Sequence, residues 1–172
     1  MGTLHIIEGL DGVGKSTLAN FLVIMAGNQP TFTPTALFHA GQPMTNNYVG
    51  EYWYPVSFLS NFTVVCDRWH LGEHVWPHLF GRTPLEPNMP LLENRMFQSF
   101  DEVYGHFLVR DQDGMNSCRN LNYDVDEAMD LYAKAMKQSQ IDWDIKTLTD
   151  YMELDDVVPT ITFAPEYLEV DE

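Results

Sequence analysis

The sequence predicts an α/β fold in which a five-stranded parallel sheet is covered by helices on both faces. One sequence pattern and one rule of sheet topology predict this class. Short β-branched and apolar runs alternate with segments whose apolar residues recur at helical spacing, and parallel strands need such helical crossovers. The length of 172 residues suits a single domain, here residues 1–172. In a sheet of this kind a ligand binds beyond the carboxyl ends of the strands.

The first half of the chain is expected to contain three strands and one long helix. Thr3–Glu8 is rich in β-branched residues and is followed by glycine, which is typical of a buried strand. Lys15–Ala26 carries apolar residues at helical spacing. Thr35–His39 and Asn61–Cys66 have the composition of the second and third strands. For the aromatic segment Met44–Leu59 the sequence does not decide between helix and irregular structure, and a break is expected near its proline.

The second half shows the same alternation. Helical spacing and strand-like composition predict helices at Trp69–Leu79, Leu91–Phe100 and Asp126–Gln140, with strands at Val103–Val109 and Val157–Phe163. Asp124 is a candidate N-cap for the last helix. A polar, glycine-containing stretch at about 110–122 is expected to form a short mobile lid.

The charge of the chain excludes some partners. Nine Lys and Arg residues stand against 25 Asp and Glu, so the formal net charge is −16. Such a surface repels nucleic-acid backbones and anionic membranes. No apolar run reaches the roughly 20 residues that a membrane span needs, and no signal peptide is visible. Cys66, inside an apolar run, is expected to be a buried free thiol, which favours a reducing, cytoplasmic compartment.

The segment after the first strand carries a phosphate-binding motif. Gly9–Ser16, GLDGVGKS, matches the P-loop pattern G-x-x-x-x-G-K-[ST]. Its glycines let backbone N–H groups surround a phosphate, Lys15 bridges the β- and γ-phosphates, and the Ser16 hydroxyl binds Mg²⁺. The motif predicts a three-layer P-loop NTPase fold that binds ATP and Mg²⁺. The nucleotide contacts are expected from Gly12, Val13, Gly14, Lys15, Ser16 and Thr17.

Two segments carry a family resemblance. Ile7–Thr17, IEGLDGVGKST, closely resembles the phosphate loop of thymidylate kinases and related deoxynucleotide kinases. Val65–Trp69, VCDRW, is similar to their Asp-Arg-aromatic motif, and Asp67–Arg82 resembles the short thymidylate-kinase-like proteins of bacteriophages. The resemblance covers residues 3–43 and 61–82. It implies ATP-dependent phosphorylation of a deoxynucleoside monophosphate in dNTP synthesis, with dTMP as the first candidate acceptor. It also suggests a homodimer and, for a phage protein, the host cytoplasm.

The same resemblance implies roles for individual residues. Arg68 would hold the acceptor phosphate, while Asp67 would orient Arg68 or bind Mg²⁺ through water. Asp11 would reach the 3′-hydroxyl of the acceptor sugar, and Glu8 would assist in that pocket. A lid arginine usually completes such sites, and Arg119 is the first candidate.

Further residues are expected around the acceptor. Arg110 is the second lid candidate, and His39 lies in the turn after the second strand. Among the tryptophans Trp53, Trp69 and Trp76, base stacking is best expected from Trp69 or Trp76. Arg82 could contact phosphate, whereas Arg95 is expected at the surface.

Three alternatives stay open. In this chain His39–Pro43 replaces the family's Arg-Glu-Pro-Gly turn, and Val75–Pro77 replaces its Ala-Tyr-Gln segment. These departures leave the base specificity open. They are also compatible with a protein that binds nucleotides without catalysis. A deoxynucleoside kinase would use Glu8 as the base. His70–His74 also matches the zinc motif H-x-x-E-H, which would indicate a metallohydrolase. Its internal glycine and the following Pro77 disfavour a metal-binding helix, so polar residues that line or flank the acceptor pocket are the favoured interpretation.

Overall fold

The computed structural model describes residues 2–28, 34–41, 43, 47–83, 85, 88–109, 121–148 and 150. Their centre is a five-stranded sheet in the order β2-β3-β1-β4-β5, in which all neighbouring strands are parallel. The strands are β1 (Thr3–Gly9), β2 (Thr35–His39), β3 (Thr63–Asp67), β4 (Glu102–Val109) and β5 (Trp143–Thr147). The predicted α/β class with a five-stranded parallel sheet is therefore confirmed.

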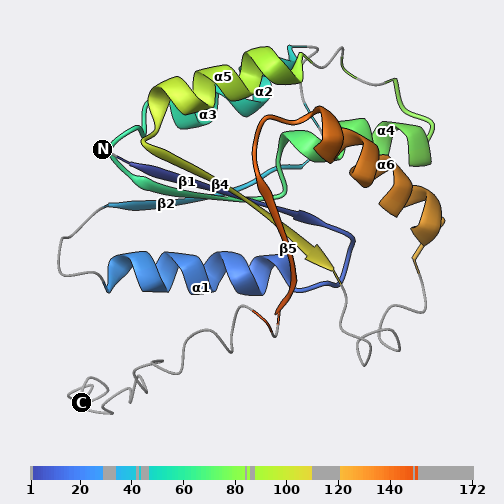
Figure 1. The fold of residues 1–172 in the computed structure, drawn as a ribbon, viewed down its shortest axis with the longest axis horizontal. Coiled ribbons are helices and arrows are strands. Elements are labelled where there is room, and N and C mark those ends of the chain that lie inside the picture. Colours follow the sequence, from blue (N-terminus) through green and yellow to red (C-terminus); the bar gives the residue numbers. More distant parts are fainter. Residues whose placement is uncertain are drawn as a thin grey trace, which may run out of the picture.

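Helices cover both faces of this sheet (Figure 1). Helix α1 (Lys15–Gly27) lies on one face, whereas α2 (Tyr48–Tyr52), α3 (Tyr54–Ser57) and α5 (Met89–Ser99) lie on the other. The 3₁₀ helix η1 (His70–His74), α4 (Trp76–Leu79) and α6 (Val125–Gln138) complete the fold. In the described part of the chain, no helix has the length and apolar character needed to cross a membrane.

Strand alternation divides the core between the two faces. Successive side chains of a strand point to opposite faces, so Ile7 packs with Leu18 of α1, whereas Ile6 packs with Cys66 and with Met96 of α5. All five side chains are fully buried. Cys66 is a free thiol, as expected, and burial raises its pKa well above the usual value.

The register of the sheet decides where the motifs meet. Ile7 of β1 is paired with Asp67, the last residue of β3, so β3 ends two residues before β1 does. The P-loop that follows β1 and the Asp67–Arg68 pair at the end of β3 therefore lie at one edge of the sheet, between adjacent strands. This edge is the expected ligand side of a parallel sheet.

The fifth strand is not the one that the sequence predicted. β5 is Trp143–Thr147, a segment for which no strand was expected, while Val157–Phe163 lies outside the described residues. β5 is an edge strand that pairs only with β4, and its Asp144 and Lys146 form an ion pair at 2.8 Å. Because one face of this strand is polar, it lacks the continuous apolar run that marks a buried strand.

The predicted helix over Trp69–Leu79 is also different in the structure. The segment forms the 3₁₀ helix η1 and then the separate short helix α4, which carries Pro77 in its first turn. Proline cannot donate a backbone hydrogen bond, so it is placed at a helix start rather than inside one long helix. The Asp124 cap is confirmed, since its carboxylate accepts the N–H groups of Asp126 and Glu127 at 2.9 and 3.1 Å. Most of the expected lid, residues 110–120, lies outside the described residues.

Candidate active site

The P-loop has the conformation that its glycines predict. Gly9, Gly12 and Gly14 have φ values of 139°, 78° and 94°, a region that side-chain-bearing residues rarely adopt. A Cβ on Gly9 would also lie 2.4 Å from the carbonyl oxygen of Leu108. Gly14 is the N-cap residue of α1, so the loop presents the N-terminus of this helix to a bound phosphate.

Lys15 folds back onto the loop. Its Nζ donates to the carbonyl oxygens of Gly9, at 2.9 Å, and of Leu10. Burial and the nearby Arg68 guanidinium lower the pKa of Lys15 to about 8, although the carboxylates of Asp11, Glu8 and Asp67 act in the opposite direction. A phosphate in the loop would compete with the two carbonyls for this ammonium group.

Ser16 and Asp67, the two residues expected to bind Mg²⁺, are hydrogen-bonded. The Ser16 hydroxyl donates to Asp67 Oδ2 at 2.6 Å, and His39 Nδ1 lies 3.2 Å from the same oxygen. Asp67 is buried, and its Oδ1 has no hydrogen-bond partner among the described residues. A buried, unpartnered carboxylate oxygen beside a hydroxyl is a donor set of oxygens, which fits Mg²⁺. No group of three or more His, Cys, Asp or Glu side chains in the described ranges is placed to hold a metal.

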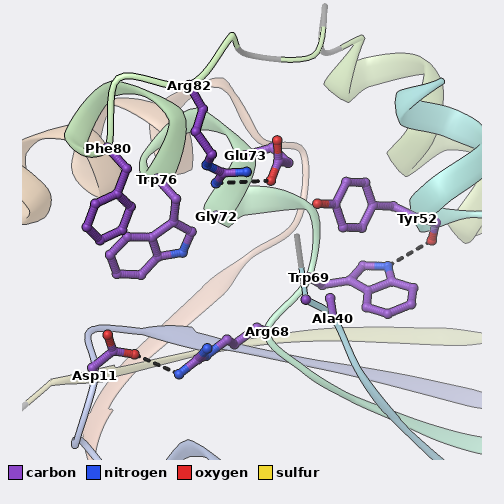
Figure 2. Close-up of a pocket in the computed structure, with 11 residues that line it drawn as sticks. Asp11, Ala40, Tyr52, Arg68, Trp69, Gly72, Glu73, Trp76, Phe80 and Arg82 are labelled. Atoms are coloured by element: carbon purple, nitrogen blue, oxygen red, sulfur yellow. Dashed lines mark hydrogen bonds and ion pairs between the residues drawn. The ribbon is translucent and has the colours of Figure 1, made fainter. Parts of the chain in front are cut away.

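Arg68 stands in a strained backbone conformation at the end of β3. Its φ is 62°, which is unusual for a residue with a side chain, and its N–H donates to the carbonyl of Ile7 at 2.9 Å. The guanidinium Nη2 lies 2.7 Å from Asp11 Oδ1, and both side chains are about 40% exposed (Figure 2). The carboxylate that orients Arg68 is thus that of Asp11, whereas Asp67 contacts Ser16 and His39.

Glu8 supports the segment that follows Arg68. Its fully buried Oε1 accepts the backbone N–H groups of Trp69, Leu71 and Gly72 at 2.9, 3.1 and 3.2 Å. Burial raises its pKa, although His70 and these amides oppose the shift. Glu8 is not among the residues that line the pocket described next, and its Oε1 is an acceptor for the backbone. Its expected role in the acceptor pocket stays a prediction.

A pocket of about 470 Å³ opens beside the P-loop and Arg68 (Figure 2). It is lined by Asp11, Ala40, Gly41, Tyr52, Arg68, Trp69, Gly72, Glu73, Trp76, Phe80 and Arg82. A second cavity of about 340 Å³ contains His39 and shares four lining residues with the first. The structure therefore brings together most of the residues that the sequence assigned to the acceptor.

The three candidate tryptophans have different surroundings. Trp76 lies along one wall of the pocket, stacked with Phe80 at 6.0 Å between ring centroids and 17° between planes. Trp69 lines the pocket but is 5% exposed, and its Nε1 donates to the Tyr52 carbonyl at 2.8 Å. The Trp53 ring lies outside this pocket, 4.8 Å from the Arg95 guanidinium. Trp76 is consequently the best placed of the three to stack on a base.

Sequence reasoning assigned no individual role to two carboxylates. Glu73 was expected only as one of the polar residues of His70–His74 that line or flank the acceptor pocket. Its side chain is 5% exposed and lines the pocket, with Arg82 Nη2 at 3.9 Å from its Oε1. Burial raises the pKa of Glu73, while Arg82 and a hydrogen bond from Tyr52 lower it. No sequence signal marked this residue beyond its position five residues after Arg68.

Glu93 is the second missed carboxylate. Its Oε1 lies 3.0 Å from Nε2 of His70 and accepts the Ser139 hydroxyl, while its Oε2 accepts the Gln140 N–H. Both the Glu93 and the His70 side chains are fully buried. This contact links η1 with α5 and the end of α6. His70, the first residue of the zinc motif, is therefore already paired with Glu93. The motif also lies in a 3₁₀ helix rather than in an α-helix. The lid candidates Arg110 and Arg119 lie outside the described residues.

Comparison with solved structures identifies the fold. The YorR protein from Bacillus subtilis, in complex with phosphorylated GDP, matches with a TM-score of 0.65 and 19% identity over 88% of this chain and 92% of that chain. Polyphosphate kinase 2 from Arthrobacter aurescens TC1 matches with a TM-score of 0.56 and 14% identity, over 84% of this chain and 60% of that chain. No family model and no curated protein matches the chain. The chain thus has a P-loop kinase-like fold.

Proposed function

We propose that this chain transfers the γ-phosphoryl group of ATP to a nucleoside monophosphate, with dTMP as the first candidate acceptor. The observation that carries the proposal is the Asp11–Arg68 ion pair at 2.7 Å, which joins the P-loop to the wall of the 470 Å³ pocket. This contact would let a triphosphate on the loop and a phosphorylated acceptor in the pocket lie next to each other. The nucleotide in the similar YorR structure supports a nucleotide ligand for this fold.

Each residue in this site has a distinct task in the proposed reaction. The P-loop N–H groups and Lys15 bind the donor phosphates, and Arg68 orients the acceptor phosphate for in-line attack. Mg²⁺, held by Ser16 and Asp67, would neutralise charge on the phosphate oxygens. The attacking oxygen belongs to an ionised phosphate, so the reaction needs no strong general base.

The geometry disfavours a deoxynucleoside kinase. That reaction would need a base to remove a hydroxyl proton, and Glu8 was the candidate. Its Oε1 instead accepts three backbone N–H groups, and Glu8 does not line the pocket. The third alternative, a nucleotide-binding protein without turnover, differs from the proposal only in its activity.

A panel of acceptors tests the proposal. ADP release and the diphosphate product are measured together for dTMP, the other common deoxy- and ribonucleoside monophosphates, and thymidine. We expect ADP in equal amount to a nucleoside diphosphate, and no phosphorylation of thymidine. Nucleotide binding without turnover on any acceptor would establish the non-catalytic alternative. We also propose a homodimer, as the family resemblance suggests, which light scattering of the purified protein tests.

A further inference from the structure

We propose that Glu73 and Arg82 read the base of the acceptor and select bases that carry a ring N–H next to a carbonyl, namely thymine, uracil and guanine. This inference rests on the proposed function for the presence of an acceptor nucleotide. It goes further by assigning the base contacts to two residues that no phosphate-binding motif includes.

The first observation is the placement of a charged pair in the acceptor pocket. The Glu73 side chain is 5% exposed and that of Arg82 is 26% exposed, and both line the cavity. Their separation of 3.9 Å is longer than a hydrogen bond, so the two groups lie adjacent without satisfying each other. No other side-chain partner of Arg82 is found in the described ranges. Both groups therefore have hydrogen-bonding capacity for a ligand.

The second observation is the distance of this pair from the phosphate end of the pocket. In Figure 2 the Asp11–Arg68 pair and the Glu73–Arg82 pair lie on opposite sides of the cavity. An acceptor whose phosphate contacts Arg68 would extend its sugar and base across the cavity toward Glu73. The far position of Glu73–Arg82 suits a base contact better than a phosphate contact.

The third observation is a flat aromatic wall next to the pair. Trp76 and Phe80 are stacked, and Tyr123 contacts the Trp76 ring edge-on at 5.3 Å between centroids and 73° between planes. A Cβ on Gly72 would lie 2.9 Å from Trp76 Nε1, so the missing side chain allows the indole to lie against η1. Nucleobases stack on such side chains without sequence preference, and the polar pair is then the part that discriminates.

The chemistry of the pair indicates which bases it reads. A carboxylate only accepts hydrogen bonds and a guanidinium only donates them. A ring N–H flanked by a carbonyl matches this pair directly, because Glu73 accepts the N–H and Arg82 donates to the carbonyl oxygen. In adenine and cytosine the corresponding ring nitrogen is an acceptor and would face the Glu73 carboxylate. Their amino N–H is also less acidic than a lactam N–H, and it forms the weaker bond to a carboxylate.

Equilibrium binding in the absence of ATP tests the inference, with quenching of tryptophan fluorescence as the readout. The probes are dTMP and 5-methyl-dCMP, which have nearly the same shape and differ only in the edge that Glu73 and Arg82 would read. We expect the wild-type protein to prefer dTMP by about tenfold to a hundredfold. In Glu73→Gln this preference should fall to near one, because an amide can turn to serve either edge. Glu127→Gln, on the exposed face of α6, is the matched control and should retain it.

A second variant separates base from phosphate recognition. Arg82→Gln should weaken the binding of thymidine and of dTMP by the same factor of about tenfold, since both carry the same base. The matched control is Arg95→Gln, whose guanidinium lies over Trp53 outside the pocket. A loss for dTMP alone would assign Arg82 to the phosphate and overturn the inference, as would an unchanged preference in Glu73→Gln. Thermal unfolding checks both variants, and the Arg82 arm decides if Glu73→Gln does not fold.

The two proposals can fail separately. Base selectivity that depends on Glu73, in a protein that never releases ADP, would support the base-reading pair and overturn the proposed kinase reaction. Turnover of dTMP and of 5-methyl-dCMP at similar rates would support the kinase reaction and overturn the base-reading pair.

Discussion

The guanidinium Nη2 of Arg68 lies 2.7 Å from Asp11 Oδ1, which ties the residue after β3 to the loop between β1 and α1. The contact joins two motifs that are far apart in the sequence. It also places a positive charge of the pocket wall next to the phosphate loop. We expect Arg68 to exchange the Asp11 carboxylate for an acceptor phosphate, which is the stronger bidentate partner.

Replacement of Arg68 by alanine should abolish most of the turnover. Removing one preorganised donor from a transition state typically costs about 100- to 1000-fold in rate. The KM for the monophosphate should rise while the affinity for ATP changes little, because Arg68 lies on the acceptor side. Steady-state kinetics with each substrate varied in turn measure this, with Arg95→Ala as the control. Equal losses for ATP and monophosphate would contradict the assignment.

Lys15 should couple nucleotide binding to proton uptake. Its pKa of about 8 in the nucleotide-free protein means that roughly half of the side chains are neutral at that pH. Bound phosphates favour the ammonium form and raise this pKa, so Mg-ADP affinity should fall as the pH rises through about 8. Calorimetry in two buffers of different ionisation enthalpy should show uptake of part of a proton near pH 8. The uptake should be lost near pH 6 and in Lys15→Met.

Asp67→Asn should raise the Mg²⁺ requirement. The carboxylate accepts the Ser16 hydroxyl at 2.6 Å, and loss of such a partner typically costs about 10- to 100-fold in metal affinity. A titration of activity with Mg²⁺ should show this shift at saturating nucleotide. Asp126→Asn, on the exposed first turn of α6, serves as the control. An unchanged half-maximal Mg²⁺ concentration would exclude Asp67 from the metal site.

Glu8→Ala should destabilise the fold by about 2–4 kcal/mol. Three backbone N–H groups lose their acceptor in a fully buried position, and each unsatisfied group is costly. Glu8→Gln keeps an acceptor oxygen and should cost less than half as much. Urea unfolding of the two variants gives the comparison. The reverse order of stability would mean that the charge, rather than the hydrogen bonds, is what matters at this position.

The free energy of unfolding should fall at mildly acidic pH. Nδ1 of His5 lies 3.0 Å from Nε2 of His106, and burial lowers the pKa of each histidine from 6.5 to about 4. The unfolded chain then binds protons that the folded one does not, so stability is full above about pH 6.5 and is lost as the pH falls toward 4. Each histidine contributes up to about 1.4 kcal/mol per pH unit.

Urea unfolding at several pH values measures this slope. His5→Asn should reduce it, whereas His78→Gln at an exposed position should leave it unchanged. A slope in His5→Asn equal to that of the wild-type protein would show that other groups, such as the partly buried His74, dominate the acid response.

The motifs whose residues are neighbours in the chain were predictable from the sequence. The glycines and Lys15 of the P-loop are close together in the chain, and their roles follow from backbone conformation and charge alone. The end of β3 was predictable for the same reason, since Asp67 and Arg68 follow a clear apolar strand. Their meeting with Ser16 and Asp11 then follows from the parallel order of β1 and β3.

Contacts between distant segments were not predictable. The His70–Glu93 pair and the Glu73–Arg82 pair depend on how η1 packs against α5 and α4, and no periodicity marks them. β5 was missed because an edge strand with a polar face carries no apolar run. The proposed base-reading pair could therefore be identified only from the folded structure, in which both residues line the pocket.

The most direct test of the account is ADP release from Mg-ATP measured with and without nucleoside monophosphates, alongside direct detection of the diphosphate product. We expect ADP release that depends on an acceptor, is greater for dTMP than for 5-methyl-dCMP, and is lost in both Lys15→Ala and Arg68→Ala. ADP release that is independent of every monophosphate, or that persists unchanged in Arg68→Ala, would contradict it.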